Sequence, residues 1–465
     1  MAGIIIAGER SGAGKTTVTL ALLAALKQRY SPGSATIQAF KVGPDYIDPM
    51  FHRYVTDCPS YNLDPIITSE TYVQRSFGYH SQGAAAVVVE GVMGLFDGAD
   101  GGSDIASTAH IARLLNLPVL LVIDCSRLSR SVAAIVHGYR SLDPCLSFAG
   151  VVLNRVGSDR HLQLLKTALC SIDVPVLGVL RREDAIAIPD RHLGLVPAAE
   201  LPQLQRQIER LADLGQRCFD WHRLAPWLPP KPTATHELPS AAPAANGPQP
   251  RIALAADAAF SFYYPDSLEV LKALGAQLVP WSPLQDEALP ENVHGLYFGG
   301  GFPEMFAAQL SSNQPLLQQL RQGIALGLPT YAECGGLMYL CRNLIDFEEH
   351  PWPMVGVLPT DVSMQPRLTL GYRCAQALQP SPLMQPSGVV WGHEFHRSAV
   401  TSPPQQPLFS LGRYGAAVPH AHEGWRVHQV HASYVHLHWG EYTAAAARFV
   451  ATCRDFAASK GHHGQ

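Results

Sequence analysis

Short apolar runs separated by segments of helical spacing recur through the first half of the chain. Runs typical of buried strands are predicted at 3–8, 35–40, 84–89, 117–124, 148–153 and 174–180. After the first run, the apolar residues from Val18 to Leu26 follow helical spacing, and a further apolar segment, 188–195, comes after the last run. Strands that alternate with helices indicate a doubly wound, mostly parallel α/β sheet with right-handed crossovers.

A change in composition divides the chain. Residues 226–250 are rich in proline and alanine, which predicts a linker between domains. We therefore expect one domain at 1–225 and a second at 251–465, in line with the domain number that a chain of 465 residues suggests. The second region opens with strand patterns at 251–257 and 295–298, so it is also predicted to be an α/β domain.

Alternation of polar and apolar residues returns near the C-terminal end. Residues 431–439 alternate strictly, which predicts a strand with His436 and His438 on the same face. One of these histidines is a candidate base for a catalytic thiol. The alternative is a surface strand in a chain that contains 20 histidines.

The loop after the first strand is rich in glycine. Its candidate nucleotide-binding residues are Gly12, Gly14, Lys15, Thr16 and Thr17. A glycine-rich loop between a strand and a helix is a P-loop, in which backbone amides cradle phosphates, Lys15 reaches the β and γ oxygens, and Thr16 is placed for Mg²⁺. Five residues rather than four separate Gly8 from Gly14, so we predict ATP binding by a widened P-loop.

Charged residues follow two of the later strands. Lys41 is followed by Asp45 and Asp48 within a run rich in proline and glycine, and Glu90 stands at the tip of a buried strand. Ligands bind at the carboxyl edge of a parallel sheet, and an acid at a strand tip is the natural second Mg²⁺ partner of a P-loop. The alternative is a pair of solvated turns. Asn154, after another strand, either hydrogen-bonds a nucleotide base or acts as an Asx-type cap.

Cys334 lies between an apolar segment, 327–332, and the pair Gly335-Gly336, which opens a helical pattern. Strand, tight turn and helix together form the geometry that exposes a nucleophile, and the amides that open the helix can hold an oxyanion. The alternative is a small buried hydrophobe, which is common for free cysteine. Upstream, three glycines at 299–301 would let a substrate approach the backbone closely.

Charge and composition exclude several classes of protein. The net charge is −4, which argues against binding nucleic acid through its phosphates. Nine scattered cysteines without a CxxC pair favour a reducing cytoplasm over a disulfide framework or a structural zinc site. The sequence contains no apolar run of membrane-spanning length, so a soluble cytoplasmic protein is expected.

Taken together, the motifs resemble the a,c-diamide synthase family of corrin biosynthesis over nearly the whole chain. The segments that carry the resemblance are the wide P-loop at 8–16, the runs 41–49 and 90–98, the glycine loop at 298–304, Glu333-Cys334-Gly335-Gly336, the segment 392–396 and the segment 434–438. The P-loop spacing is similar to that of dethiobiotin synthetase. The second domain looks like a class I glutamine amidotransferase of the cobyric-acid type.

The resemblance implies an ATP- and glutamine-dependent carbon–nitrogen ligase. Cys334 would release ammonia from L-glutamine with His436 as its base, with His438 as the less favoured alternative. Many class I members carry His-Pro-Glu, but here Leu437 and His438 follow His436, so the usual acid is absent from that place. Gly300 and Gly301 would lie near the glutamine carbonyl.

In the first domain the resemblance implies that ATP and Mg²⁺ convert the c- and then the a-carboxylate of cobyrinate into acyl phosphates, which ammonia displaces. Thr16, Asp48 and Glu90 would hold the metal, and Asp45, Tyr46 and Asp97 would handle substrate or ammonia. A homodimer is expected because the enzymes that this chain resembles often associate.

Two alternatives remain open at this point. The same reaction could act on hydrogenobyrinic acid or on a nickel sirohydrochlorin, because substrate specificity must lie in loops that carry no recognisable motif. A different class is a P-loop regulatory ATPase of the partitioning type with a non-catalytic second domain.

Overall fold

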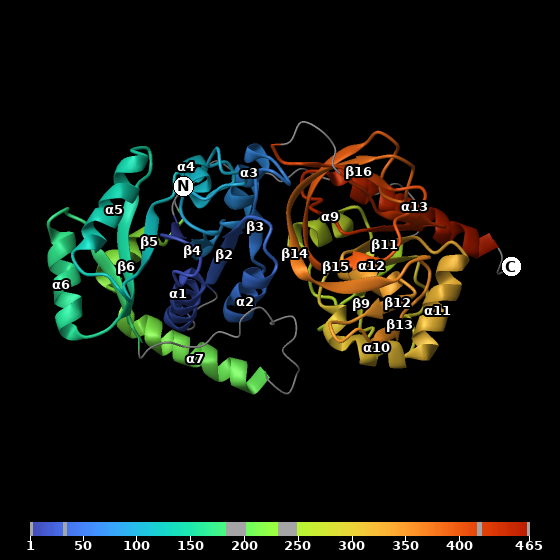
Figure 1. Cartoon of the computed structure of the whole chain (residues 1–465), viewed down its shortest axis with the longest axis horizontal. Helices are drawn as coiled ribbons and strands as arrows, with labels where there is room; N and C mark the ends of the chain where they lie inside the picture. The colour runs from blue at the N-terminus through green and yellow to red at the C-terminus, as the bar shows by residue number, and fades with distance from the viewer. Residues whose placement is uncertain (1–2, 31–34, 183–200, 231–248, 416–420, 463–465) are drawn as a thin grey trace. The chain divides into compact units, whose positions relative to one another are not determined.

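The computed structural model describes residues 3–30, 35–182, 201–230, 249–415 and 421–462. They form two compact units, one made mainly of the chain up to residue 238 and the other mainly of the chain after it (Figure 1). The predicted segment 188–195 and most of the predicted linker lie outside the described residues. Pro226 and Trp227, at the start of that predicted linker, lie in a short 3₁₀ helix, η4 (Ala225–Trp227).

The first unit is built on a seven-stranded sheet in which every pair of neighbours is parallel. In spatial order its strands are β3 (Tyr61–Leu63), β2 (Thr36–Val42), β4 (Ala84–Glu90), β1 (Ile4–Gly8), β5 (Val119–Asp124), β6 (Phe148–Val156) and β7 (Val176–Arg181). The predicted α/β class is confirmed, and six of these strands overlap the predicted runs. The edge strand β3 was not predicted, because three residues are too few to show a period.

Helices cover both faces of this sheet, as the doubly wound prediction requires. They are α1 (Lys15–Tyr30), α2 (Ile47–Thr56), α3 (Glu70–His80), α4 (Thr108–Leu115), α5 (Ser131–Leu142), α6 (Asp159–Cys170), α7 (Leu201–Cys218) and α8 (Trp221–Leu224). Successive residues of β1 point to opposite faces. Ile4 and Ile6 pack in the core shared with α1, α2 and α7, whereas Ile5 and Ala7 pack in the core shared with α3 to α6 (Figure 1).

The strand order places three predicted loops side by side. β4 lies between β2 and β1, with Glu90 in register with both Lys41 and Ile6. The loops after β1, β2 and β4 therefore leave the same edge of the sheet at neighbouring positions. The fold thus brings together the P-loop, the run after Lys41, and Glu90.

The second unit contains a six-stranded sheet, parallel except for one edge pair. Its strands in spatial order are β18 (Trp425–Val427), β19 (Val430–Ser433), β11 (Thr330–Glu333), β10 (Gly295–Phe298), β8 (Arg251–Ala255) and β9 (Gln277–Trp281). The helical elements of this unit are α9 (Pro265–Ala273), η5 (Pro303–Phe306), α10 (Ala307–Ser312), α11 (Gln314–Ala325), α12 (Gly335–Leu340) and α13 (Thr443–His462).

A second sheet in this unit was not predicted. Its strands are β12 (Asn343–Ile345), β13 (Pro351–Pro353), β14 (Val362–Ala377), β15 (Val389–Val400), β16 (Phe409–Arg413), β17 (Ala421–Glu423) and β20 (His436–Leu437). The long antiparallel pair of β14 and β15 forms its centre (Figure 1). Burial alternates at both ends of β14, but no residue from Gln365 to Tyr372 is buried, and Gly392, His393 and Glu394 of β15 are buried in succession. The two-residue period is therefore confined to short stretches of these long strands.

The single strand predicted at 431–439 is wrong. β19 ends at Ser433 and pairs with β11, whereas β20 begins at His436 and pairs with β15 of the other sheet. The surface-strand alternative is also wrong, because every residue from His431 to Trp439 is buried. Two strands that cross between sheets inside the core can alternate in polarity without having a solvent face.

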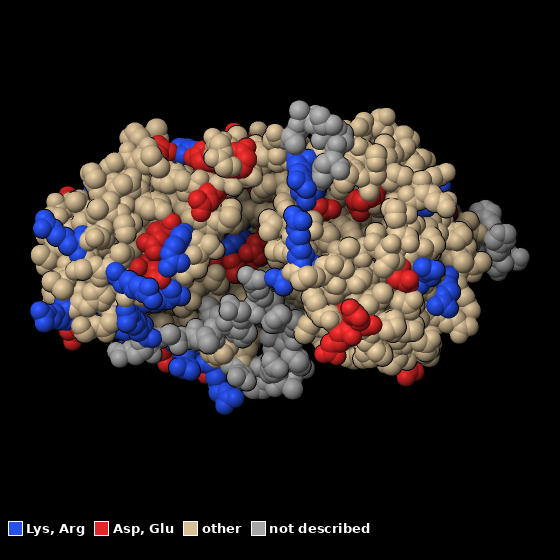
Figure 2. Space-filling view, viewed as in Figure 1, with Lys and Arg blue, Asp and Glu red and all other residues tan. Residues whose placement is uncertain are grey.

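The surface carries few charges. On the face shown in Figure 2, Lys and Arg side chains are interspersed with Asp and Glu among a majority of uncharged residues. Charged residues make up 15% of the chain, and this mixture fits the weak net charge. Among the helices that the structure describes, none has the length and apolar character needed to cross a membrane.

Candidate functional site

The P-loop connects β1 to α1 and is fixed by a residue from β6. Gly14 has a φ of +98°, and a Cβ built on it would lie 2.2 Å from the Asn154 Nδ2 atom. That nitrogen donates a hydrogen bond of 2.9 Å to the Ala13 carbonyl, and Asn154 Oδ1 accepts from the amide of Arg155. Asn154 therefore holds the P-loop through Ala13 and hydrogen-bonds the backbone next to it within β6 (Phe148–Val156). Gly12 also has a positive φ, +76°, which the tight loop requires.

Lys15 is the first residue of α1 and its side chain is buried. Its ammonium donates to the carbonyl of Met93 and lies 3.5 Å from the carbonyl of Arg10. Burial, followed by repulsion from Lys41, lowers the pKa of Lys15 to about 8. A cation so poorly solvated gains strongly from an incoming phosphate, which supplies the missing counter-charge. Thr17, also predicted, lies half-buried in the first turn of the same helix.

The three residues predicted to hold a metal lie together. The Thr16 hydroxyl donates to Glu90 at 2.7 Å and lies 3.5 Å from Asp48 Oδ1. Among the described residues, no group of three or more His, Cys, Asp or Glu side chains has the arrangement of a metal site. Mg²⁺ does not need such a cage, because it keeps several waters and takes one or two carboxylates. Two carboxylates and a hydroxyl are donors that fit this ion.

Lys41 is the central cation of this cluster. Its buried ammonium donates to Asp48 and lies 3.3 Å from Glu90 and 3.6 Å from Asp45. Burial alone would lower the pKa of Lys41, but the attraction of these carboxylates outweighs burial and raises it. For Glu90 burial would raise the pKa, yet Lys41 and the hydrogen bonds of its neighbours lower it. Burial and repulsion from Glu90 raise the pKa of Asp48.

His52 is a member of this cluster that the sequence reasoning missed. Its Nε2 lies 2.8 Å from Glu90 Oε2 and its Nδ1 lies 3.0 Å from the Ser60 hydroxyl, and the ring is completely buried. It belongs to α2, one helical turn after Asp48. The spacing of four residues from Asp48 was the available signal, because residues i and i+4 share a helix face. His52 fixes the side of Glu90 that Thr16 and Lys41 do not contact.

The three residues predicted to handle substrate or ammonia lie around this cluster. Asp45 accepts from the amide of Ile47 at 2.8 Å, and Tyr46 is buried at the start of α2. Asp97 is exposed and its carboxylate accepts from the amide of Gly94 at 2.8 Å, which forms a local turn. Asp97 is nevertheless close enough to Lys15 to raise its pKa slightly against the larger effects of burial and Lys41.

Cys334 occupies the sharp turn between β11 and α12. Its φ is +46° and ψ is −97°, a backbone conformation that non-glycine residues rarely adopt. The Cys334 amide donates to the Ser433 carbonyl at 2.8 Å, and the thiol lies 3.8 Å from the carbonyl of Phe395 on β15. Burial, with Glu304 as the next contribution, raises the pKa of the Cys334 thiol. This thiol needs a base in order to react near neutral pH.

The glycine loop after β10 makes room for a histidine. A Cβ on Gly300 would lie 2.5 Å from His436 Cε1, so the imidazole packs directly on this glycine. Gly301 has a φ of +158°, and a Cβ there would lie 2.1 Å from the Ala259 carbonyl. Both positions therefore exclude a side chain, and backbone and imidazole approach each other closely.

The two candidate histidines have different surroundings. His438 has Asp266 3.4 Å from its Nε2, accepts from the Gly440 amide through Nδ1, and packs against the ring of Tyr264. Both of its ring nitrogens are thus near structural partners. His436 instead packs on Gly300 of the glycine loop. The geometry favours His436 over His438 as the partner of the thiol.

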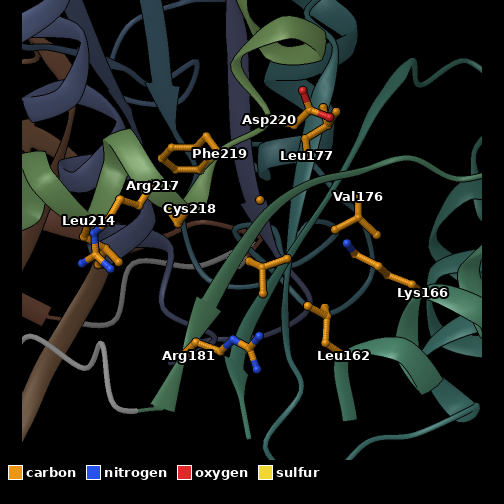
Figure 3. Close-up of a pocket in the computed structure, with 12 residues that line it drawn as sticks. Leu162, Lys166, Val176, Leu177, Arg181, Leu214, Arg217, Cys218, Phe219 and Asp220 are labelled. Carbon is orange, nitrogen blue, oxygen red and sulfur yellow. The ribbon is translucent and has the colours of Figure 1, made fainter. Parts of the chain in front are cut away.

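Two cavities lined by described residues contain neither Cys334, His436 nor any of the predicted nucleotide- and metal-binding side chains. A cavity of about 390 Å³ adjoins the edge strand β7 and is lined by Lys166, Arg181, Arg217 and Phe219 among others (Figure 3). Another, of about 450 Å³, borders the P-loop at Glu9 and Arg10. None of the predicted site residues lines the cavity at β7.

Comparison with known families defines the class of protein that these two sites represent. Residues 4–196 match the CobQ/CobB/MinD/ParA nucleotide binding domain, and residues 251–444 match the CobB/CobQ-like glutamine amidotransferase domain. The chain therefore combines a P-loop nucleotide-binding domain with a glutamine amidotransferase domain.

Full-length relatives make the assignment narrower. The chain is 56% identical over 452 residues to a cobyrinate a,c-diamide synthase of a Synechococcus species, covering 97% of this chain and 98% of the relative. It is 51% identical to a protein of the same name from a Synechocystis species, over 97% of this chain and 94% of the relative. It is 42% identical to a hydrogenobyrinate a,c-diamide synthase of Streptomyces coelicolor, over 97% of both chains. The chain belongs to the a,c-diamide synthase family.

Proposed function

We propose that this chain uses ATP and glutamine to convert the c- and a-carboxylates of cobyrinate into amides in cobalamin biosynthesis. The observation that carries the proposal is the 56% identity to a cobyrinate a,c-diamide synthase along 97% of the chain. Three further relatives of that name are 48%, 40% and 41% identical to this chain. Hydrogenobyrinate is the second candidate, because one relative with that substrate in its name is 42% identical.

In the proposed glutaminase half-reaction, Cys334 attacks the side-chain amide of glutamine. His436 removes the thiol proton and gives it to the departing ammonia, which leaves a γ-glutamyl thioester on Cys334. Water then hydrolyses this thioester, which releases glutamate and regenerates the thiol. The backbone of Gly300 and Gly301 lies beside His436, where it can border the glutamine carbonyl. Because burial raises the pKa of the Cys334 thiol, transfer of its proton to His436 is what makes attack possible near neutral pH.

In the proposed synthetase half-reaction, a substrate carboxylate attacks the γ-phosphate of ATP and becomes an acyl phosphate. Lys15 and the amides of the P-loop, with Gly12 and Gly14, bind the phosphates. Thr16, Asp48 and Glu90 would hold Mg²⁺, which neutralises charge on the phosphates when bound. Lys41 keeps Asp48 and Glu90 together despite their like charges.

Ammonia then displaces phosphate from the acyl phosphate and gives the amide. Phosphate is a far better leaving group than the oxygen of a free carboxylate. Asp45, Tyr46 and Asp97 would position the substrate or accept the proton that ammonia loses. Asn154 would contribute to nucleotide binding indirectly, because its hydrogen bond to the Ala13 carbonyl holds the P-loop in place.

The proposal includes a cellular setting. All nine cysteines are free thiols, which supports the reducing cytoplasm. A homodimer is part of the proposal, and light scattering on the purified chain tests it.

Product analysis tests the function. The purified protein is incubated with ATP, Mg²⁺, glutamine and either cobyrinic or hydrogenobyrinic acid, and products are followed by mass spectrometry. Two successive conversions of a carboxylate into an amide support the proposal. The substrate that is converted faster identifies the ring system. The Cys334→Ser variant should lose glutamine-dependent product by about 1,000-fold or more while retaining ammonia-dependent product.

Two outcomes contradict the proposal. ATP hydrolysis without any amide product would favour a regulatory P-loop ATPase. Loss of both the glutamine and ammonia reactions in a correctly folded Cys334→Ser protein would show that the thiol is not confined to the glutaminase step.

A further inference from the structure

We infer that Glu333, the residue immediately before the nucleophile, is the positioning residue that orients His436. Its carboxylate takes the place of the acid that many class I amidotransferases carry two residues after the histidine. The inference deepens the proposed glutaminase reaction and rests on it.

Glu333 ends β11 and its side chain is buried. Its Oε1 accepts from the Leu437 amide at 3.0 Å and from the Tyr331 hydroxyl. Its Oε2 lies 3.4 Å from the Tyr297 hydroxyl and 3.8 Å from His436 Nδ1. Buried carboxylates are costly unless they are paired, so this arrangement has to serve a purpose that a neutral side chain would not.

The position of the carboxylate follows from the topology. β11 lies in one sheet and β20, which carries His436, lies in the other. The hydrogen bond from the Leu437 amide to Glu333 joins the two sheets one residue after His436. The same side chain thus fixes both the backbone next to the base and the side of its imidazole that bears Nδ1.

An acid at Nδ1 determines which ring nitrogen can act as a base. A proton on Nδ1 that faces a carboxylate leaves Nε2 unprotonated and able to receive the thiol proton. The separation of 3.8 Å is an ion-pair distance rather than a hydrogen bond. Catalytic contacts are often long before the substrate binds and shorten in the complex.

His438 provides an internal comparison. Asp266 lies 3.4 Å from its Nε2, and its Nδ1 accepts from the Gly440 amide. That arrangement leaves no ring nitrogen of His438 for the thiol. Each histidine therefore has its own carboxylate, but only the carboxylate of His436 adjoins the nucleophile in the chain.

The test replaces Glu333 with glutamine. An amide nitrogen toward Nδ1 would favour the tautomer with the proton on Nε2, which cannot accept the thiol proton. We expect kcat for glutamine hydrolysis to fall by about 100-fold or more, with KM for glutamine changed by less than about threefold. Ammonia-dependent amidation should stay at the wild-type rate. Alkylation of Cys334 by iodoacetamide should also move to higher pH, because the thiolate loses its stabilising imidazolium.

Tyr331→Phe is the matched control. It removes a hydroxyl that donates to the same carboxylate but leaves the negative charge facing His436. We expect a loss of less than about tenfold and an unchanged pH profile of alkylation, since one neutral hydrogen bond is worth only about 1 kcal/mol. A loss equal to that of Glu333→Gln would assign Glu333 a structural role and overturn the inference.

A second measurement covers the case in which Glu333→Gln does not fold. Nitrogen NMR of histidine-labelled wild-type protein, with His436→Gln used for assignment, reports the tautomer of His436. A proton on Nδ1 near neutral pH supports the inference, and a proton on Nε2 overturns it. Wild-type glutaminase activity in a folded Glu333→Gln protein also overturns it, while the Cys334→Ser result separately decides the proposed function.

Discussion

The two candidate sites treat buried charge in opposite ways. At the edge of the first sheet, the buried ammonium of Lys41 lies within 3.6 Å of the carboxylates of Asp45, Asp48 and Glu90. At the turn after β11 the nucleophile is a thiol whose pKa is raised by burial and next by Glu304. The first site surrounds a buried cation with carboxylates before any substrate binds, whereas the second has to create its charge during the reaction.

This difference fits the chemistry that each site is proposed to perform. Phosphoryl transfer needs fixed charges that are already in place when ATP arrives. Attack by a thiol needs a base that acts only when the substrate is bound. The two sites therefore limit the cost of desolvation in different ways. The first pairs its buried cation with carboxylates, and the second keeps its thiol neutral until the reaction begins.

The largest expected effect comes from Glu90→Gln. It removes the carboxylate shared by Thr16, Lys41 and His52, and we expect glutamine- and ammonia-dependent amidation both to fall by about 1,000-fold. Glutamine hydrolysis at Cys334 should continue. Separate assays of amide product and of glutamate check this contrast, with Glu209→Gln, an exposed residue of α7, as the control. An equal loss of amide product and of glutamate would contradict the assignment of the two half-reactions to separate sites.

Lys41→Met tests whether the first cluster depends on its central cation. Breaking a buried pair leaves uncompensated carboxylates, so the free energy of unfolding should fall by about 3–5 kcal/mol. Adding Asp48→Asn should recover part of that loss. The control is Lys27→Met, whose ion pair with Asp57 lies at the surface and is expected to contribute about 1 kcal/mol or less. Denaturant unfolding measures all three variants, and similar losses for both lysines would contradict the argument.

Gly300→Ala tests the close packing at the second site. The added Cβ would lie 2.5 Å from His436 Cε1 and would displace the imidazole. We expect glutamine hydrolysis to fall by about 10- to 100-fold, because small displacements of catalytic groups are costly, with little change in ammonia-dependent amidation. Gly323→Ala, whose Cβ would meet only Leu328 at 3.4 Å, should leave both rates unchanged. A fully active Gly300→Ala enzyme would show that the position of His436 does not matter for glutamine hydrolysis.

The smallest effect is a pH dependence of ATP binding. Lys15 is charged below its pKa of about 8 and loses its charge as the pH rises through that value. KM for ATP should therefore be constant below about pH 7.5 and increase by up to about tenfold per unit above about pH 8.5. Calorimetry in buffers of different ionisation enthalpy should detect proton uptake on ATP binding in the alkaline range. A KM that stays flat in that range would show that Lys15 remains charged.

The sequence predicted much of the first unit because its signals are local. Buried parallel strands are short continuous apolar runs, and a P-loop is a contiguous motif, so β1, β2 and β4 and the residues after them could be placed in advance. His52 was missed because its spacing from Asp48 shows only a shared helix face, and not that its ring reaches Glu90 on a different strand. The second sheet was missed because the alternation of β14 is interrupted across residues 365–372 and that of β15 across residues 392–394.

The fold class, the P-loop and a cysteine at a strand–turn–helix junction could all be predicted from the order of the amino acids. The surroundings of that cysteine, in contrast, became visible only once the strands were placed in three dimensions. The tertiary structure split the alternating segment 431–439 between two sheets, set Asp266 beside His438, and brought Glu333 to His436 across 103 positions of the chain, from 333 to 436. The physical reason is that periodicity reports which side of an element is buried, whereas the partner of a buried carboxylate depends on how separate strands pack.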